Sequence, residues 1–490
     1  MWTAIARSAA HDASAPRDPL KRVDDLNIVH CQSWQYDDPA ARLAERLELP
    51  PGRRTVSILA GTSPQRLLNA AAERMLQGDT RVALVVGGEA LATKARLRRV
   101  GQTPAWSAAH PNPTASPLDL DEWFLPTELA HGVIPAWLTF ALLDQARRIA
   151  RQADLVAYRR ELGQMLARCN AVAARNPHAW FRDERTADEI ITPSPANRMI
   201  AQPYTKLMTA YMDVDMAAGV LLATHDEAES LGVPQERRVY LRGWGFARDA
   251  THVGARAELG RSAAMRAAAT ATLRSAGITI DDVALFDLYS CFTAALGFAT
   301  DALGLNEDDP RPLTLTGALP YHGGPSSNYM SHSIGHVVER LREEPDEFAL
   351  VSGVGMHMTK HVFACYSTRP GPVRAPDYEA IQEAADRQQP DCPVVASATG
   401  DAVILAATTV FDHDSAPSWL LAVSQLPDGR RAYARTTDPE VLASQADDAW
   451  IGRTVELRAG PNGTNTFHSP GGGSGCRGGL ATSQGGDSGS

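Results

Sequence analysis

Compact apolar runs and helical spacings alternate between residues 1 and 90. Apolar runs at 26–30, 55–59 and 82–86 predict strands, the last of them buried. Apolar residues at helical spacing predict helices at the N-terminus, over 40–47 and from 64 to 76. Near-continuous apolar strands that alternate with helices are typical of a covered, partly parallel sheet. The pattern therefore predicts an α/β fold.

A similar order of elements returns after residue 235. The spacing predicts helices over 263–276 and 294–303, and strands over 238–245, 283–288, 348–354 and 362–367. The repeat suggests two duplicated α/β halves, at 1–235 and 236–368. Prolines and tryptophans are frequent from about 100 to 204, so this segment predicts an inserted, mostly helical domain, after which 214–223 returns as a buried strand.

The C-terminal region follows a different pattern. After a linker at 370–376, residues 377–467 predict one helix and then short alternating strands, with a hairpin turn at Pro427-Asp428-Gly429. This arrangement is consistent with a small barrel. Residues 468–490 are rich in glycine and serine without apolar periodicity, which predicts a disordered tail.

Composition narrows the class of protein. A chain of 490 residues is too long for one core. The net charge of −10 provides no clustered basic face for nucleic acid, and no apolar run approaches the roughly 20 residues of a membrane span. The start has no long apolar region of a secretory signal. Six scattered cysteines form no CxxC pair, which favours a reducing, cytoplasmic setting.

The segment 314–340 holds the first candidate chemistry. An apolar, strand-like run ends at Gly317, a glycine pair follows at Gly323 and Gly324, and His332 stands just ahead of a helical pattern. Glycines allow close approach of a ligand or backbone, and a helix N-terminus favours developing negative charge. The pattern therefore predicts a site at a strand-to-helix junction.

Several segments in order resemble the thiolase superfamily over residues 1–368. They are the alanine-rich helix 64–77 followed by VALVVGGEA, the strand VDMAAGVLLA at 214–223, AGITIDDVALFDLYSCF at 276–292, and the histidine motif at 332–340. With its C-terminal OB-type domain, the chain is most similar to actinobacterial thiolase-like proteins usually labelled acetyl-CoA acetyltransferases. The resemblance implies two βαβαβαββ halves in α/β/α/β/α layers, a coenzyme A thioester as substrate, no covalently bound cofactor, and a homodimer.

In that family a strand precedes the first helix, whereas this sequence opens on the helix. The resemblance therefore implies either a start that lies too late or an absent strand, which would leave an open edge in the sheet.

The resemblance also shows departures at both cysteines of the family. Gly61 stands where the nucleophilic cysteine takes the acyl group, and Ser352 lies nearest to the acid/base cysteine. Thr62 or Ser63 could replace the nucleophile, but Ser63 before Pro64 is typical of a helix N-cap. Ser352 is a poor acid/base at neutral pH, and a turn residue in a glycine-rich loop is the favoured interpretation. Acyl transfer through a cysteine is therefore not expected.

The remaining motif positions are polar. Tyr289 falls where the family has Asn or His, and a tyrosine there resembles thiolase-like retro-aldolases that lack the cysteine. His332 matches the histidine that donates to the thioester oxygen, which stabilises the enolate. Tyr289 is the candidate acid/base or oxyanion donor. The same loop implies substrate contacts for His322, Gly323, Gly324 and Asn328, and Gly61 faces them.

Two pairs with four-residue spacing, His332/His336 and His357/His361, raise a metal hypothesis. Neither carries the HExxH glutamate, and no metal is expected.

Three functions follow from this sequence. The first is an acyltransferase-like enzyme of fatty acid or sterol metabolism that acts on the carbon–carbon bond next to a CoA thioester. A retro-aldol lyase that uses Tyr289 on β-hydroxyacyl-CoA is a variant of it. The second is a non-catalytic acyl-CoA or lipid-binding protein, and the third is a scaffold for a partner acyl-CoA enzyme.

Overall fold

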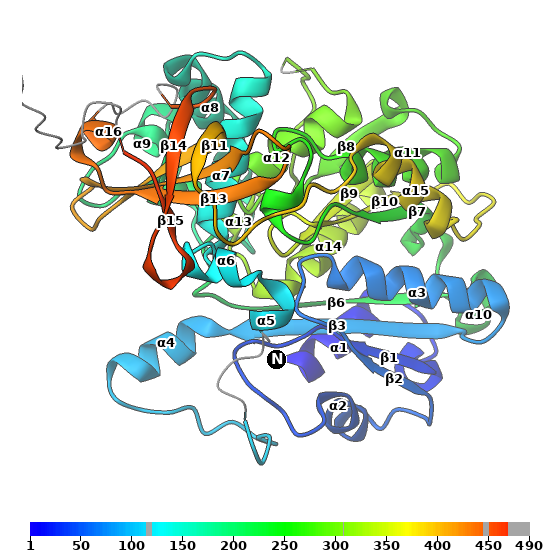
Figure 1. Cartoon of the computed structure of the whole chain (residues 1–490). Helices are drawn as coiled ribbons and strands as arrows, with labels where there is room; N and C mark the ends of the chain where they lie inside the picture. Colours follow the sequence, from blue (N-terminus) through cyan, green and yellow to red (C-terminus); the bar gives the residue numbers. More distant parts are fainter. Residues whose placement is uncertain (114–119, 307, 444–449, 469–490) are drawn as a thin grey trace, which may run out of the picture.

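The computed structural model describes residues 1–113, 120–306, 308–443 and 450–468. Figure 1 shows a blue N-terminal half, a green and yellow second half, and a C-terminal domain in orange and red. In these ranges no helix combines the length and apolar character needed to cross a bilayer.

The first half is built on the sheet β2-β1-β3-β6. Its strands are β1 (Asp25–Ile28), β2 (Arg53–Val56), β3 (Val82–Ala90) and β6 (Asp215–Ala223). β1 runs parallel to β2 and β3, whereas β6 pairs antiparallel with β3. Its helices are α1 (Trp2–Asp12), α2 (Pro39–Leu47) and α3 (Ser63–Gln77), so the predicted alternation of strands and helices is confirmed.

The second half is built on the sheet β7-β10-β9-β8. Its strands are β7 (Tyr240–Arg248), β8 (Val283–Asp287), β9 (Phe348–Gly355) and β10 (Lys360–Ser367). β8 runs parallel to β9, β10 pairs antiparallel with β9, and β7 pairs antiparallel with the other side of β10. The helices α11 (Ala263–Ala276), α12 (Thr293–Leu303) and α14 (Tyr329–Glu343) complete it. The described strands β1-β3-β6 and β8-β9-β10 therefore match in order and direction, which agrees with the predicted duplication.

The two sheets sandwich one layer of helices. α3 and α14 lie between the sheets, and each contacts strands of both. α1 and α2 cover the outer face of the first sheet, and α11 covers the second. This gives the five-layered α/β/α/β/α arrangement of a thiolase fold, as the sequence predicted.

The inserted segment is helical and joins the C-terminal domain. It holds α4 (Leu91–Arg99), α5 (Leu120–Trp123), α6 (Pro126–Ala130), α7 (Ala136–Ala150), α8 (Leu155–Arg175) and α9 (Ala187–Ile191), with the short strands β4 (Met199–Ala201) and β5 (Tyr204–Thr205). β4 pairs with the C-terminal strand β11 (Gly400–Phe411) at one position. The Tyr433 hydroxyl also donates to the Glu128 carboxylate at 2.7 Å. The inserted segment and the C-terminal domain therefore pack against each other.

The pairings of the C-terminal domain close a ring. The strands are β11, β12 (Pro417–Gln425), β13 (Arg431–Thr436), β15 (Asn465–Thr466) and β14 (Thr454–Ala459). In this order each strand pairs with the next, and β14 pairs with β11 again. This closed ring is the predicted small barrel. α15 (Tyr378–Gln388) precedes it and packs on α11 and β7. The predicted tail falls outside the described residues apart from His468.

Three local predictions are wrong. Residues 314–317 form bends, not a strand, because the Asp287 carboxylate takes up their backbone amides. His332 lies inside the first turn of α14, not ahead of it. Residues 394–399 form an isolated bridge at Val394 rather than a strand.

Candidate functional site

Gly61 lies in the turn between β2 and α3, where the first half meets the second. A Cβ atom at this position would overlap the Val354 carbonyl oxygen and the Tyr289 hydroxyl. The position at which the resemblance places the nucleophile therefore has no side chain, and Tyr289 and Val354 of the second half occupy the space beside it.

The neighbouring hydroxyls do not replace that nucleophile. α3 begins at Ser63, whose hydroxyl donates to the Ile58 carbonyl oxygen at 2.8 Å. Thr62 is the N-cap residue and makes no side-chain cap bond. The N-cap prediction for Ser63 is therefore wrong by one residue, and its hydroxyl is engaged in the turn.

Tyr289 follows β8 and points toward Gly61. Its ring lies edge-on to the Tyr329 ring, with centroids 5.5 Å apart, and its side chain is buried. Burial, with a smaller contribution from Cys291, raises the pKa of the phenol above its usual value of about 10. Tyr289 is therefore protonated at neutral pH, so it can donate a hydrogen bond but cannot act as a resident base.

His322, His332 and His336 form a cluster with His178. The ring centroid of His322 lies 5.3 Å from that of His332 and 5.6 Å from that of His336. Burial, then His336, lowers the pKa of His322 to about 4. Burial, then His322, lowers the pKa of His332 well below its usual value. Both imidazoles are therefore neutral at pH 7.

Hydrogen bonds assign the tautomers of two of these rings. His336 Nδ1 donates to the His332 carbonyl oxygen at 2.9 Å, and its Nε2 accepts from Asn176 at 2.9 Å. His322 Nδ1 donates to the Gly323 carbonyl oxygen at 3.2 Å, which leaves Nε2 as an acceptor. Among the described residues, Nε2 of His322 and Nε2 of His332 are buried without a partner. These two are the buried nitrogens of the cluster that are left without a hydrogen bond to the described chain.

Other predicted residues are engaged in packing. Ser352 lies in β9, and its hydroxyl accepts from the Tyr289 backbone N–H at 2.9 Å. The Asn328 carboxamide oxygen accepts from Ser331 at 2.8 Å and lies 2.5 Å from where a Cβ atom at Gly87 would stand. Ser352 and Asn328 thus stabilise the backbone and side chains around the site through these contacts.

The glycine pair shapes the loop that carries His322. Gly323 has φ of +102°, and a Cβ atom there would lie 2.9 Å from Met216 Sδ. The Gly324 N–H donates to the Tyr211 carbonyl oxygen at 2.8 Å. The close approach that the glycines predicted is therefore made by the protein's own Tyr211 and Met216, just before and within β6.

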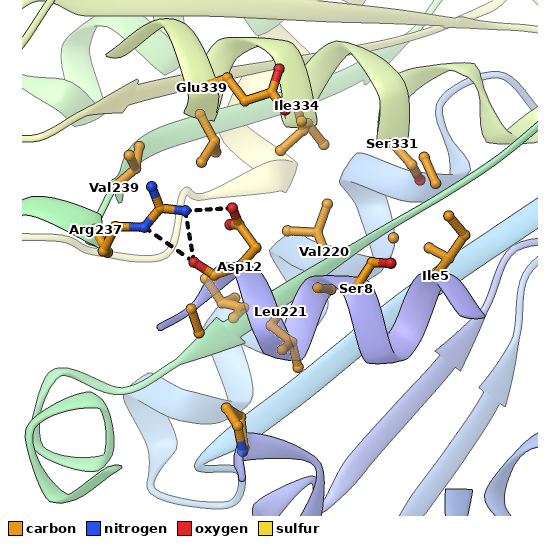
Figure 2. A pocket seen from close by; sticks show the side chains of 18 of the residues that line it. Ile5, Ser8, Asp12, Val220, Leu221, Arg237, Val239, Ser331, Ile334 and Glu339 are labelled. Carbon is orange, nitrogen blue, oxygen red and sulfur yellow. Dashed lines mark hydrogen bonds and ion pairs between the residues drawn. The ribbon is translucent and has the colours of Figure 1, made fainter. Parts of the chain in front are cut away.

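A cavity of about 1190 Å³ lies beside this cluster, and we call it the β6 groove. Figure 2 shows it between α14 above and α1 below, with β6 along it. His332, His336 and His178 line it, whereas Gly61, Tyr289, Ser352 and His322 do not. Of the predicted site residues, His332 therefore borders the groove, whereas Gly61, Tyr289, Ser352 and His322 are packed away from it.

Sequence reasoning missed the carboxylate that organises the site. Asp287, at the end of β8, accepts from the backbone N–H groups of Leu315 and Thr316 at 2.8 and 2.9 Å. Its Oδ2 also accepts from the hydroxyls of Thr314 and Thr316. The signal available in the sequence was an acidic residue at a strand end with two threonines downstream. This pattern is too common to identify Asp287 as a site residue by itself.

The histidine pairs do not form metal sites. His336 is bonded within the helix and to Asn176, and His361 Nε2 bonds to the Asp249 carboxylate at 2.8 Å. Across the described ranges, no three His, Cys, Asp or Glu side chains are arranged to hold a metal ion.

Comparisons with known proteins agree with this architecture. A family model described as the thiolase-like protein type 1 additional C-terminal domain matches residues 381–461. The crystal structure of a monomeric SCP2-thiolase-like protein type 1 from Mycobacterium smegmatis is 30% identical, covers 95% of each chain and has a TM-score of 0.82. No curated protein sequence matches.

Two thiolases share the fold at lower identity. Human mitochondrial 3-ketoacyl-CoA thiolase and the dimeric peroxisomal thiolase of Saccharomyces cerevisiae are each 14% identical, with TM-scores of 0.52. Each match covers 75% of this chain and 92% of the thiolase. The close match over nearly the whole chain shows that this protein belongs to the SCP2-thiolase-like protein type 1 family of the thiolase superfamily.

Proposed function

We propose that this protein binds the thioester end of an acyl-CoA without forming a covalent acyl-enzyme. The observation that carries the proposal is the position of Gly61, where the Tyr289 hydroxyl and the Val354 carbonyl oxygen fill the space of a nucleophilic side chain. Cys291 cannot substitute, because burial raises the pKa of its thiol far above neutrality.

His332 is the group that contacts the thioester. Its side chain lines the β6 groove, its Nε2 has no partner among the described residues, and its lowered pKa keeps it neutral. A neutral imidazole can donate a single hydrogen bond to a carbonyl oxygen, which stabilises negative charge that develops there. Gly323, Gly324, Asn328 and His322, which were predicted as substrate contacts, belong to the loop that precedes α14, the helix that carries His332.

A second candidate is carbon–carbon lyase activity on a β-hydroxyacyl-CoA. The pairing of His322 and His332 favours it, because two neutral imidazoles with open nitrogens lie 5.3 Å apart. The β-hydroxyl proton would pass by way of His332, which lines the groove, to His322 Nε2 behind it. The bond between the α and β carbons would break, and the His332 N–H would stabilise the resulting enolate. In this version Tyr289 donates a proton or hydrogen bond and does not act as the base.

The assembly and setting also belong to this proposal. The predicted homodimer lacks support, because the related Mycobacterium smegmatis protein is described as monomeric, and we propose a monomer. All five described cysteines are free, which supports the predicted reducing, cytoplasmic compartment. A scaffold for a partner acyl-CoA enzyme remains the alternative if no ligand binds.

Calorimetry and mass spectrometry together test the proposal. Acetyl-CoA and longer acyl-CoAs should bind, His332→Ala should weaken binding about tenfold or more, and intact mass should show no acylated protein. His413→Ala, an exposed histidine in the barrel turn, is the matched control and should bind normally. Efficient thiolysis of acetoacetyl-CoA with CoA would overturn the proposal. Product release from a β-hydroxyacyl-CoA that is lost in His322→Asn would establish the lyase.

A further inference from the structure

The inserted segment reaches the loop that carries His322 at the end of α8. Asn176 is buried and follows the last residue of α8, and its N–H donates to the carbonyl oxygens of Val172 and Ala173. The Cβ atom of Ala173 lies 2.4 Å from where a Cβ atom at Gly317 would stand. Only glycine fits at that position, so the end of α8 packs directly on the loop.

The Asn176 carboxamide makes hydrogen bonds to three different segments. Its oxygen accepts from the His178 N–H at 2.9 Å. Its nitrogen donates to the Thr316 carbonyl oxygen at 2.8 Å and to His336 Nε2 at 2.9 Å. Both N–H groups of the carboxamide are therefore used, one toward the loop and one toward α14. A single side chain thus joins the inserted segment to the loop and the helix that carry the two histidines with open nitrogens.

Residues 176–181, which we call the strap, continue along the same loop. The Trp180 N–H donates to the His322 carbonyl oxygen, and the Phe181 N–H donates to the Tyr321 carbonyl oxygen, each at 2.9 Å. The side chains of Trp180 and Phe181 are exposed, so these contacts to the loop come from the main chain. The strap therefore holds the backbone that carries the His322 ring.

The second half and the inserted segment hold this loop together. The second half holds Thr316 through its N–H, whereas the inserted segment holds it through its carbonyl oxygen, which accepts from Asn176. The other donor of Asn176 goes to His336, which lies about one turn after His332 along α14. Because the loop carries His322 and α14 carries His332, the Asn176 bonds set the place of one ring against the other.

We propose that Asn176 is a positioning residue for the pair His322 and His332. It acts through Thr316 and His336, and it contacts no substrate itself. Its bond to His336 Nε2 also fixes the tautomer of that ring, with the proton on Nδ1. The consequence for acyl-CoA binding rests on the proposed function, whereas the arrangement of the rings is a property of the free protein.

Two variants and one control test this role. Asn176→Ala removes all three bonds, and Asn176→Asp keeps the size of the side chain but replaces its donors with an acceptor. Asn170→Ala is the matched control, because Asn170 is also buried in α8 and bonds only within the inserted segment, to Asp183 and Arg185. NMR of the ligand-free proteins follows the ring nitrogens and ring–ring contacts of the histidines, and calorimetry follows acetyl-CoA binding.

In the free protein, Asn176→Asp should place a proton on His336 Nε2, because the carboxylate can only accept. Asn176→Ala should weaken the ring contact between His322 and His332. Both variants should weaken acetyl-CoA binding about tenfold, whereas Asn170→Ala should lower the thermal midpoint and leave rings and binding unchanged.

Two results would overturn the positioning role. The first is ring signals in Asn176→Asp that match those of the parent protein. The second is an equal change of the rings in Asn170→Ala, which would reflect a general loosening of the inserted segment. Failure of the parent protein to bind acetyl-CoA would instead overturn the proposed function, and the ring signals would still decide the role of Asn176.

Discussion

The two halves carry the same central pair of antiparallel strands but bury them differently. β10 lies between β9 and β7 and is buried along nearly its whole length. β6 has β3 on one side and a groove of about 1190 Å³ along the other, and most of it is half-buried. Duplicated topology therefore does not imply duplicated stability, because an edge strand lacks the pairing and packing of a central one.

The difference also explains how the site is divided. The second half supplies Tyr289, Ser352 and the loop around His322, all of them buried. The first half contributes Gly61, which offers no side chain, and the β6 and α1 walls of the groove that His332 lines from the second half. The polar groups thus come from the second half, whereas both halves form the groove, and the predictions below test the contrast between the halves.

The largest effect is expected from β7, which has no counterpart among the described strands of the first half. Trp244 is fully buried, and its indole N–H reaches the Glu73 carboxylate and the Tyr378 hydroxyl, both at 3.1 Å. Trp244→Ala should lower the free energy of unfolding by about 3–5 kcal/mol through loss of burial and an open cavity. Urea unfolding measures it, and a loss below about 1 kcal/mol would show that β7 contributes little.

A second effect concerns pH and the histidine cluster of the second half. His322 has a pKa of about 4 in the folded chain, below its usual value of 6.5, so it takes up a proton on unfolding. Its contribution to stability is complete above pH 6.5 and is lost as the pH falls toward 4, by up to about 3 kcal/mol.

His322→Asn should therefore flatten the decline in unfolding free energy between pH 6.5 and 4, whatever its effect at pH 7. His30 of the first half is the matched control. Burial lowers its pKa as well, but its side chain is only partly buried, so His30→Asn should flatten the decline less. Parallel pH profiles for His322→Asn and the parent protein would contradict this prediction.

A third effect lies at the contact between the halves. Gly61→Ala places a methyl group against Tyr289 and the Val354 carbonyl oxygen, and it should cost about 1–3 kcal/mol. The matched control is Gly335→Ala in α14, where no described atom lies within 4 Å of the added Cβ atom. That change should stabilise the helix by about 0.5–1 kcal/mol. Similar thermal midpoints for the two variants would contradict this prediction, because they would show that the turn around Gly61 accommodates the methyl group without loss of stability.

The smallest effect compares one substitution on equivalent strands. Val362 in β10 is fully buried, whereas Val220 in β6 is half-buried and lines the groove. Val362→Ala should cost about 2 kcal/mol and Val220→Ala about 1 kcal/mol or less. Equal losses by chemical denaturation would remove the contrast between the strands.

Long periodic elements were predictable from the sequence because their burial pattern is local. α11 was predicted at its observed bounds, Ala263–Ala276, and the strands near 283 and 348 begin where predicted. The segment 314–317 was not predictable, since its apolar residues are held in bends by the distant carboxylate of Asp287. His332, predicted as a site residue from its motif, lines the groove, but its place within α14 was not predicted.

The sequence by itself determined the duplicated α/β order, the additional C-terminal barrel and the absence of a cysteine at position 61. These depend on residue type and spacing along the chain. Only the tertiary structure decided that the Tyr289 hydroxyl fills the space at Gly61, that His322 and His332 keep open nitrogens, and that β6 borders an empty groove. Each of these depends on contacts between residues far apart in the chain, which no local pattern records.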